Sequence, residues 1–328
     1  MTSPVVWRER LPEARDAKSL RQAYADALLE LAPARPDLLV LDADLSRSTT
    51  TDQFAATFPN QFYNMGIAEQ NMVGIAAGLA AVGFTPFVTT YSIFIARCLD
   101  QIRQSVSYPR ANVKIVGSHG GLAASFDGGS HQGLEDIAFM RVLPHLEILV
   151  PADHVQAQAA VRYAADHQGP VYIRLQKEPT AVFIQPEEAR GAGEVVWGRA
   201  GGLTIVTCGS VAWRCLAAAR RLEAQATPCR VALCARVKPL DEALIRRLAA
   251  ESRAILVVEE HMKIGGLFEA VCAALRGAAS RPLDAVAMPD RYGETGPWDV
   301  LLDHFGFAPE AIAAAGIRLL AAAEPLAW

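Results

Sequence analysis

Short apolar segments alternate with longer segments of helical spacing, and this alternation limits the folds that the chain can adopt. In the first half, the apolar segments predict buried strands at 38–44, 87–91, 112–118, 146–152 and 170–176. Helical spacing predicts helices over 67–84, 92–106 and 153–167. Strands that alternate with helices form parallel sheets with helices on both faces. The sequence therefore predicts an α/β fold.

A segment rich in proline and glycine, residues 178–202, interrupts this pattern. The alternation then resumes, with predicted strands at 203–209, 229–235 and 254–260 and a helix over 265–275. A chain of 328 residues is long enough for two domains of about 150 residues each. We expect two α/β domains, each with a mostly parallel sheet between helices. The expected divisions are an N-terminal extension at 1–14, a first domain at 15–180, a linker at 181–197 and a second domain at 198–325.

The composition argues against several classes of protein. The net charge is −4 and no run of Lys or Arg occurs, so we expect no nucleic-acid partner. No apolar segment approaches the roughly 18 residues that span a membrane, and the first residues lack the apolar core of a signal peptide. The six cysteines form no CxxC pair and most lie in apolar segments, which is typical of free thiols in a reducing cytoplasm. We expect a cytoplasmic protein that does not contact a membrane.

Polar and aromatic residues follow several predicted strands of the first domain. Asp42 and Asp44 end one strand, Tyr91 ends another, His119 follows a third, and Arg174 lies near the end of a fourth. Ligands of such sheets bind beyond the carboxyl ends of the strands, so we expect these residues to converge at one edge. None of the motifs GxGxxG, GxxxxGK[ST], GxSxG or HExxH accompanies them. The chain therefore lacks an evident loop for a diphosphate.

Two short segments near this edge carry candidate catalytic groups, and each has two interpretations. Glu69 lies near the start of a predicted helix. It is either a first-turn carboxylate that interacts with the helix dipole or a partly buried acid with a raised pKa that transfers protons. Tyr91, Phe94 and Arg97 follow an i, i+3, i+6 spacing. They form either a core stripe or an aromatic platform for a flat ring with Arg97 beside it.

A glycine-rich loop at 117–136 contains His119, Asp127 and His131. Glycines let a backbone approach a ligand closely, and histidines in loops after strands are more often functional than histidines on helix faces. Three further residues are candidates for binding a phosphate or a similar anion, although each alone is compatible with an ordinary surface residue. These residues are Arg21, Ser48 and Arg174.

Three motifs in this order and spacing resemble the pyrimidine-binding domain of the transketolase family: GIAEQNMVGIAAGLA, TPFVTTYSIFIARCLDQI and SHGGLAASFDGGSHQGLED. The second domain resembles the transketolase C-terminal domain in the motifs VKPLD and VVEEHMKIGGLFEAV. Full-length transketolases carry another domain before these two, which binds the diphosphate of thiamine diphosphate through a metal and contains a GDG…N motif. This motif is missing here. The chain therefore resembles the C-terminal subunit of a split transketolase.

The resemblance implies a cofactor, a partner and a reaction. The cofactor is thiamine diphosphate, and a separate N-terminal transketolase subunit would hold its diphosphate with Mg²⁺ or Ca²⁺. The implied reaction transfers a two-carbon ketol unit from a sugar phosphate or a related anionic ketose to an aldose. We expect an α2β2 heterotetramer whose active site lies between chains, and we expect this chain alone to be inactive.

The resemblance also implies roles for single residues. Glu69 matches the glutamate that hydrogen-bonds the pyrimidine ring and so promotes deprotonation of the cofactor. Phe94 matches the aromatic residue that stacks on this ring, and His131 matches a histidine that binds the ketose oxygen or transfers its proton. Asp127 would bind a sugar hydroxyl. The remaining cofactor positions are Tyr91, Arg97 and Asp44, and the set expected to hold the far phosphate is Arg21, Ser48, His119 and Arg174.

The chain departs from the family pattern around His131. Many transketolases read GEDGPTHQ or GPDGPTHQ, whereas this chain reads SFDGGSHQ. The departures are at Ser125, Phe126 and Gly129, and we expect the bulky Phe126 to reshape the sugar channel beside Asp127. These differences bear on the substrate rather than on the class of reaction.

Three other functions compete with this interpretation. The β subunit of a 2-oxoacid dehydrogenase has the same domain order and would decarboxylate a 2-oxoacid; the DGGSHQ segment and the expected anion-binding set argue against it. A deoxyxylulose-phosphate synthase is disfavoured because that enzyme carries all three domains in one chain. A non-catalytic scaffold of the same fold is disfavoured because Glu69, Phe94 and His131 are intact.

Overall fold

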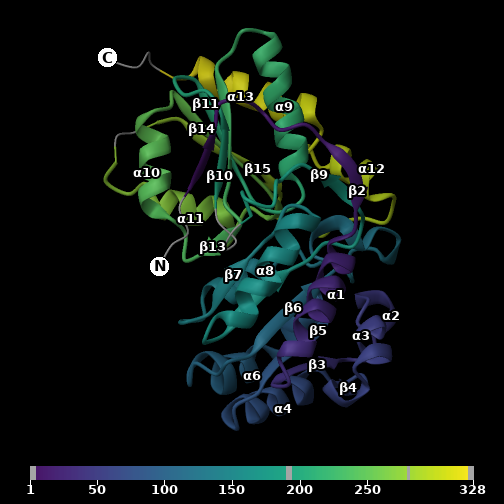
Figure 1. Ribbon diagram of the computed structural model, residues 1–328. Helices are drawn as coiled ribbons and strands as arrows, with labels where there is room; N and C mark the ends of the chain where they lie inside the picture. The colour runs from purple at the N-terminus through teal and green to yellow at the C-terminus, as the bar shows by residue number, and fades with distance from the viewer. Residues whose placement is uncertain (1–4, 190–193, 279–280, 324–328) are drawn as a thin grey trace.

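The computed structural model describes residues 5–189, 194–278 and 281–323. It contains two α/β domains, each built on a mostly parallel sheet between helices (Figure 1). In spatial order, the strands of the first sheet are β13 (Arg236–Lys238), β7 (Glu147–Leu149), β8 (Val171–Arg174), β6 (Lys114–Ser118), β5 (Thr85–Tyr91), β3 (Leu38–Asp42) and β4 (Phe62–Asn64). β13 is antiparallel to β7, and the other neighbouring pairs are parallel. This architecture confirms the predicted fold class.

Helices cover both faces of the first sheet. They are α1 (Leu20–Leu31), α2 (Ser46–Thr49), α3 (Asp52–Thr57), α4 (Glu69–Ala81), α5 (Ser92–Ile95), α6 (Leu99–Gln101), α7 (Asp136–Arg141) and α8 (His154–Asp166). On one face, α1 and α8 pack against each other and bury Leu28 and Val161. On the other face, α4 and α7 bury Met72 and Ile137. The central strands are therefore buried on both sides, as their continuous apolar sequences require.

The helix predicted over 92–106 is present as a continuous helical segment over 92–107, whose hydrogen-bond pattern changes along its length. It consists of α5, a 3₁₀ turn (Ala96–Cys98), α6 and a π-helical turn (Ile102–Ser107). Within the 3₁₀ turn, the Arg97 carbonyl accepts a hydrogen bond from Gln70 Nε2 of α4 at 2.8 Å. This contact joins the segment to the neighbouring helix α4.

The second sheet has the spatial order β1 (Val6–Arg8), β10 (Val195–Gly198), β12 (Cys229–Leu233), β11 (Leu203–Thr207), β14 (Ala254–Met262) and β15 (Leu283–Met288). Its helices are α9 (Ala212–Ala224), α10 (Glu242–Ala250), α11 (Leu267–Ala274), α12 (Trp298–His304) and α13 (Pro309–Ala321). The buried residues of α9, α12 and α13 share one core cluster, and those of α10 and α11 share another that continues into the first domain. All six cysteines are free thiols, and all but Cys272 are buried.

The segment Trp298–Ala321 is long and apolar enough to cross a membrane, by length and composition alone. It is divided between α12 and α13, and Pro309 begins the second of these helices. Leu302, Ile312 and Leu320 from both helices lie in the core of the second domain. These contacts are those of core helices in a folded domain.

The two domains exchange edge strands. β1, from the predicted N-terminal extension, pairs in parallel with β10 of the second sheet. β13, from the second domain, pairs with β7 of the first sheet. The predicted linker, 181–197, contains most of β10 and most of β9 (Thr180–Val182), and β9 pairs with β2 (Arg15–Lys18). Residues 190–193 of that linker lie outside the described residues. The proline- and glycine-rich segment indicates a single connection between the domains. In the structure, β1 and β13 also connect them, because each lies in the sheet of the other domain.

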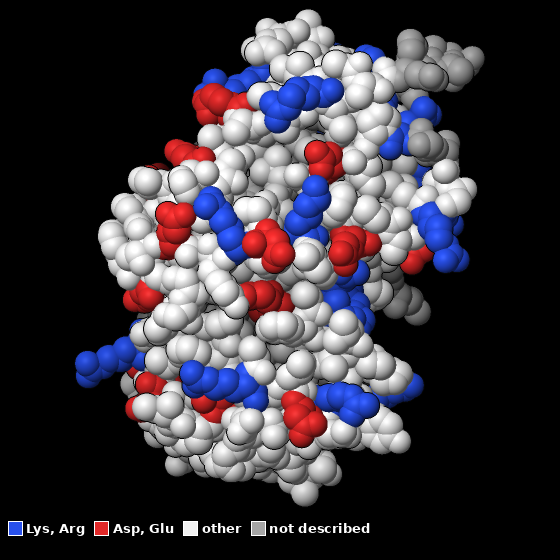
Figure 2. All heavy atoms as spheres, turned by 180° about the vertical axis from the view of Figure 1, so that it is seen from behind, with Lys and Arg blue, Asp and Glu red and all other residues white. Residues whose placement is uncertain are grey.

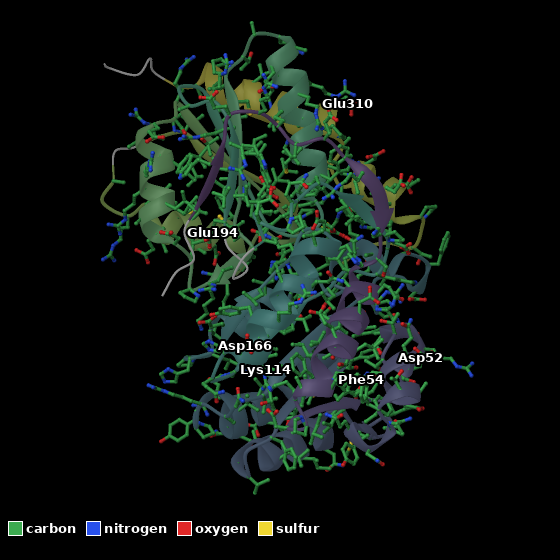
Figure 3. The ribbon with its side chains drawn as sticks, in the orientation of Figure 1. Asp52, Phe54, Lys114, Asp166, Glu194 and Glu310 are labelled. Atoms are coloured by element: carbon green, nitrogen blue, oxygen red, sulfur yellow. The ribbon has the colours of Figure 1, made fainter. Side chains whose placement is uncertain are left out.

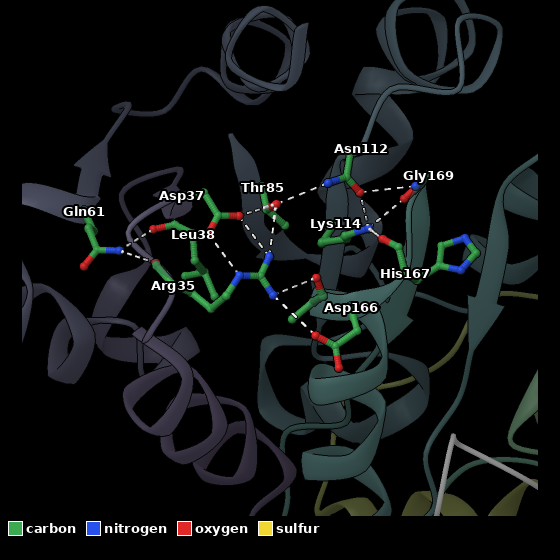
Figure 4. A network of polar contacts seen from close by, with 11 residues as sticks. Arg35, Asp37, Leu38, Gln61, Thr85, Asn112, Lys114, Asp166, His167 and Gly169 are labelled. Atoms are coloured by element: carbon green, nitrogen blue, oxygen red, sulfur yellow. Dashed lines mark hydrogen bonds and ion pairs between the residues drawn. The ribbon is translucent and has the colours of Figure 1, made fainter. Parts of the chain in front are cut away.

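A polar network closes the amino-terminal edge of the first sheet. Lys114 begins β6 and is buried, and Figure 3 places it in the lower domain. Its ammonium donates to Asn112 Oδ1 at 2.6 Å and to the carbonyls of His167 and Gly169 at 2.7 Å each (Figure 4). These three oxygens accept the hydrogen bonds of the buried amine, while its burial lowers the pKa of Lys114 to about 7. The network fixes the edge opposite the one where the strand ends carry polar and aromatic residues.

The surface charges are mixed in sign. Figure 2 shows Lys and Arg interspersed with Asp and Glu over the face that it presents. Several of the exposed cations form ion pairs, such as Arg246 with Glu242 at 3.2 Å and Lys263 with Asp284 at 2.9 Å. A surface that binds nucleic acid instead gathers Lys and Arg in a patch or stripe of positive charge.

A buried ion pair lies where the two domains meet. Arg174 ends β8, and its Nε lies 2.9 Å from Asp136 Oδ2 at the start of α7. Its Nη2 donates to Gly133 O at 2.7 Å and to Glu260 O of β14 at 3.1 Å. Burial by itself would lower the pKa of Arg174. The Asp136 carboxylate outweighs this effect and raises the pKa of Arg174 above its ordinary value. The guanidinium is therefore charged and is bonded to both domains.

We predict that Arg174→Met and Asp136→Leu, made singly, each lower the free energy of unfolding by about 3–5 kcal/mol, because each leaves one buried charge unpaired. The double variant should recover much of this loss, since neither charge then remains. Urea denaturation of the full chain measures all three variants. The exposed pair Arg246–Glu242 is the control, and its removal should cost less than about 1 kcal/mol. Single variants as stable as this control would contradict the prediction.

Candidate active site

A cavity of about 420 Å³ lies at the carboxyl edge of the first sheet. Seven of the eleven predicted site residues line it: Asp44, Glu69, Tyr91, Phe94, Arg97, Asp127 and His131. Ala43, Leu45 and Ile67 complete the lining, so every lining residue belongs to the first domain. An adjacent hollow of about 510 Å³ extends along the start of α4 and shares Glu69 and Arg97 with it. The strand ends and the start of α4 thus converge as their sequence positions predict.

Glu69 is the first residue of α4, and its side chain is buried in the cavity wall. The residue is 5% exposed. Its Oε1 lies 3.5 Å from Nη1 of the exposed Arg97. A carboxylate that only interacts with a helix dipole can remain in solvent, as Glu242 does at the start of α10. The burial of Glu69 beside a cavity therefore favours the interpretation as a functional acid.

The aromatic residues form a stack along one side of the cavity. The ring centroids of Tyr91 and Phe94 are 5.3 Å apart with an interplanar angle of 10°. His119 stacks on Tyr91 at 3.7 Å, and the ring of His131 meets Phe94 edge-on at 5.5 Å. The Arg97 guanidinium lies 4.8 Å from the centroid of the Phe94 ring. Phe94 thus lies at the cavity, as an aromatic platform requires, whereas the adjacent Ile95 enters the core.

The glycine-rich loop places His131 and Asp127 at the cavity. Gly121 N donates to Gly133 O at 2.8 Å and closes the base of the loop. The Ser130 hydroxyl lies 3.0 Å from Nδ1 of His131, which leaves Nε2 as the ring nitrogen without a bond to any residue that the structure describes. Asp127 forms an ion pair with Lys177 at 3.4 Å. The loop therefore combines a histidine with an adjoining pair of opposite charges.

His119 is a neutral hydrogen-bonding group. Its Nδ1 lies 2.8 Å from Ser118 Oγ, and its side chain is buried beneath Tyr91. Burial, followed by electrostatic interaction with Arg21, Lys177 and His131, lowers the pKa of His119 to about 3. At neutral pH its ring is therefore neutral and adds no positive charge.

The predicted anion-binding residues divide into two groups. Arg21, Ser48 and His119 are not lining residues of the cavity; Arg21 donates to the carbonyls of Ser48 and Lys177, and His119 stacks on the lining residue Tyr91. Arg174 does not line the cavity, because Asp136 and two carbonyls hold its guanidinium at the domain junction. Sequence reasoning missed Lys177, which lies three residues beyond the end of β8. Its position could have identified Lys177. A cation that follows the end of a strand lies at the edge of the sheet where ligands bind, whereas a cation within a buried strand does not.

Family models agree with this architecture. The model of the transketolase pyrimidine-binding domain matches residues 16–181, and the model of the transketolase C-terminal domain matches residues 194–312. The chain is 36% identical over 295 residues to a 6-deoxy-6-sulfo-D-fructose transketolase subunit of Clostridium sp. (strain MSTE9), a match that covers 89% of this chain and 92% of the relative.

A second relative and a solved structure are also similar over nearly their whole length. The chain is 33% identical over 299 residues to an apulose-4-phosphate transketolase subunit of Phocaeicola vulgatus, a match that covers 89% of this chain and 94% of the relative. A solved split-gene transketolase, an inactive β4 tetramer, superposes with a TM-score of 0.85 at 40% identity and covers 94% of this chain and 100% of that one. The chain therefore belongs to the transketolase family and contains its pyrimidine-binding and C-terminal domains.

Proposed function

We propose that this chain is the C-terminal subunit of a thiamine-diphosphate-dependent transketolase that transfers a two-carbon ketol unit from an anionic ketose to an aldose. One observation carries the proposal: a single cavity holds the buried carboxyl of Glu69, the rings of Tyr91 and Phe94, and His131. We assign the diphosphate and its Mg²⁺ or Ca²⁺ to a separate N-terminal subunit, because two relatives that match over nearly their whole length are named as transketolase subunits. The complex is proposed to be a cytoplasmic α2β2 heterotetramer.

The lining residues fit the pyrimidine ring of the cofactor. A flat heteroaromatic ring requires an aromatic surface and a group that hydrogen-bonds a ring nitrogen, and Phe94 and Glu69 lie at the same cavity. When bound, thiamine diphosphate supplies the electron sink that permits cleavage of a carbon–carbon bond. The Glu69 carboxyl would hold a proton on a pyrimidine nitrogen. Arg97, 4.8 Å from the Phe94 centroid, would cover the same side of the site.

His131 would act on the substrate. The Ser130 hydroxyl hydrogen-bonds Nδ1 and so orients the ring, which leaves Nε2 to bind the ketose oxygen and to transfer its proton. The edge-on contact with Phe94 holds the imidazole against the aromatic platform. Asp127, on the same loop, would accept a hydrogen bond from a sugar hydroxyl.

The far end of the substrate would bind to a cationic group next to the lining residue Asp127, which forms an ion pair with Lys177. This group contains Arg21 and Lys177, with Ser48 and the neutral His119 as hydrogen-bonding partners. Lys177 takes the place that the sequence assigned to Arg174. The names of the two relatives describe one sugar with a sulfo group and one with a phosphate, which supports an anionic terminal group. Phe126, 70% exposed beside Asp127, adds an apolar surface next to these charges.

We predict that the purified chain alone does not turn over ketoses and that activity appears when the N-terminal subunit, thiamine diphosphate and Mg²⁺ are added. The solved split-gene relative is an inactive β4 tetramer, which supports this expectation. The assay measures ketol transfer from phosphorylated and sulfonated ketoses, and light scattering gives the stoichiometry. Turnover by the chain alone would refute the shared site. Decarboxylation of 2-oxoacids in place of ketol transfer would favour the dehydrogenase alternative, and a folded complex without either activity would favour the scaffold.

We predict that Glu69→Gln lowers kcat of the complex by about 100- to 10,000-fold, because glutamine keeps the size of the side chain but cannot hold the acidic proton. Assembly with the partner, measured by size-exclusion chromatography, should not change. The matched control is Glu242→Gln, which removes a first-turn carboxylate from the exposed start of α10 and should leave kcat unchanged. Equal effects of the two substitutions on kcat would mean that Glu69 only interacts with the helix dipole and takes no part in catalysis.

We predict that Lys177→Met raises KM for an anionic ketose by about 10-fold, the loss expected from one charge-assisted hydrogen bond. KM for the same ketose without its terminal anion should change little, and Lys177→Arg should retain most of the affinity. Steady-state kinetics with the matched pair of ketoses measures this difference. A uniform change for both ketoses would exclude Lys177 from the anion site.

A further inference from the structure

The second domain contributes no residue to the cavity lining, yet one of its side chains reaches the loop that carries His119, Asp127 and His131. Glu260 lies near the end of β14 and is 4% exposed. Its Oε1 accepts a hydrogen bond from the amide of Leu122 at 2.7 Å and another from Trp298 Nε1 at 3.0 Å. One carboxylate of the second domain therefore links the loop of the first domain to the start of α12.

The close approach of Glu260 leaves no room for a side chain at position 121. A Cβ added to Gly121 would lie 2.5 Å from Glu260 Oε1, and the residue also has a φ of +76°. Leu122 is the second residue of the 3₁₀ segment Gly121–Asp127, which connects His119 with Asp127 and the turn before His131. A change at Glu260 would therefore act on the loop at the point where its turn begins.

The loop backbone requires an external support. His119 and Ser125 are not glycines, but their φ angles are +59° and +55°. Non-glycine residues in this left-handed region persist where the surrounding structure holds them. The second domain holds the far end of the loop as well, since Gln132 Nε2 donates to Glu294 O at 2.8 Å and Met262 N donates to Leu134 O at 2.8 Å.

We propose that Glu260 is a positioning residue for the active site: by bonding the Leu122 amide and Trp298, it holds the loop in the conformation that places Asp127 and His131 at the cavity. The effect of Glu260 on the loop follows from its hydrogen bonds to Leu122 and Trp298. Its effect on catalysis rests on the proposed function. The second domain thereby sets the geometry of a site to which it contributes no lining residue.

Amide hydrogen exchange of the full chain tests the effect on the loop without any assay of activity. Glu260→Ala should raise the exchange rate of residues 119–134 by about 10-fold or more, because it removes the acceptor of the Leu122 amide. Glu260→Gln should restore protection, since both hydrogen bonds end on Oε1 and an amide oxygen can replace it. Unchanged exchange of this segment in Glu260→Ala would overturn the proposal, whether or not the complex transfers ketol units.

The neighbouring Glu259 provides a matched control. It is equally buried on β14, but its carboxylate accepts hydrogen bonds from Leu267 N at 2.6 Å and Phe268 N at 2.8 Å, at the start of α11 in its own domain. Glu259→Ala should raise exchange at 266–275 and leave residues 119–134 protected. Faster exchange of the loop in both variants would indicate general loosening of the second domain and would overturn a specific role of Glu260.

Kinetics of the complex test the catalytic consequence. Glu260→Ala should lower kcat by about 10- to 100-fold, the effect of a misplaced catalytic group, with a smaller change in KM. Glu260→Gln should retain wild-type kcat. Trp298→Phe, which keeps the ring but removes the Nε1 donor, provides a milder variant if Glu260→Ala does not fold, and it should raise loop exchange and lower kcat together. A wild-type kcat in a variant whose loop exchanges faster would overturn the positioning role. Faster loop exchange together with a wild-type complex that transfers no ketol unit would refute the proposed function and leave the structural part supported.

Discussion

A charged guanidinium inside a protein is tolerated only where its partners surround it, and Arg174 imposes this condition on the centre of the molecule. Its partners come from three parts of the chain: the side chain of Asp136, the carbonyl of Gly133 and the carbonyl of Glu260. These groups belong to α7, to the loop before it and to β14 of the second domain. The end of β8, the end of the glycine-rich loop and the domain junction therefore all depend on the pairing of this one buried charge.

The position of the site follows from the sheet, and this part could be predicted from the sequence. Because parallel strands end at a common edge, residues that follow them in sequence meet in space, as Asp44 and Tyr91 do. The separation of Arg174 from Lys177 could not be predicted, because the two cations are three positions apart and the pattern does not locate the end of a strand so closely. For the same reason, the sequence does not show that Arg174, rather than Lys177, pairs with the buried carboxylate of Asp136.

Long-range pairing accounts for most of what the sequence did not reveal. β1 and β13 are three residues each, too short for an alternation of apolar and polar residues to show, and each is specified by a partner strand from the other domain. The conformation of the loop is likewise set from outside, since His119 and Ser125 adopt φ values that their own side chains disfavour. Local patterns predict elements with their own periodicity, whereas these features depend on distant surfaces.

The exchange of edge strands bears on the order in which the chain can fold during synthesis. Val6–Arg8 emerges early, but its partner Val195–Gly198 is made only after the whole first domain has been translated. Conversely, the first sheet lacks its outermost strand until Arg236–Lys238 has been synthesised. Domains of a nascent chain usually fold one after another from the N-terminus. Here the first sheet is complete only after Arg236–Lys238 of the second domain has been made, so the first domain cannot reach its final form before part of the second is synthesised.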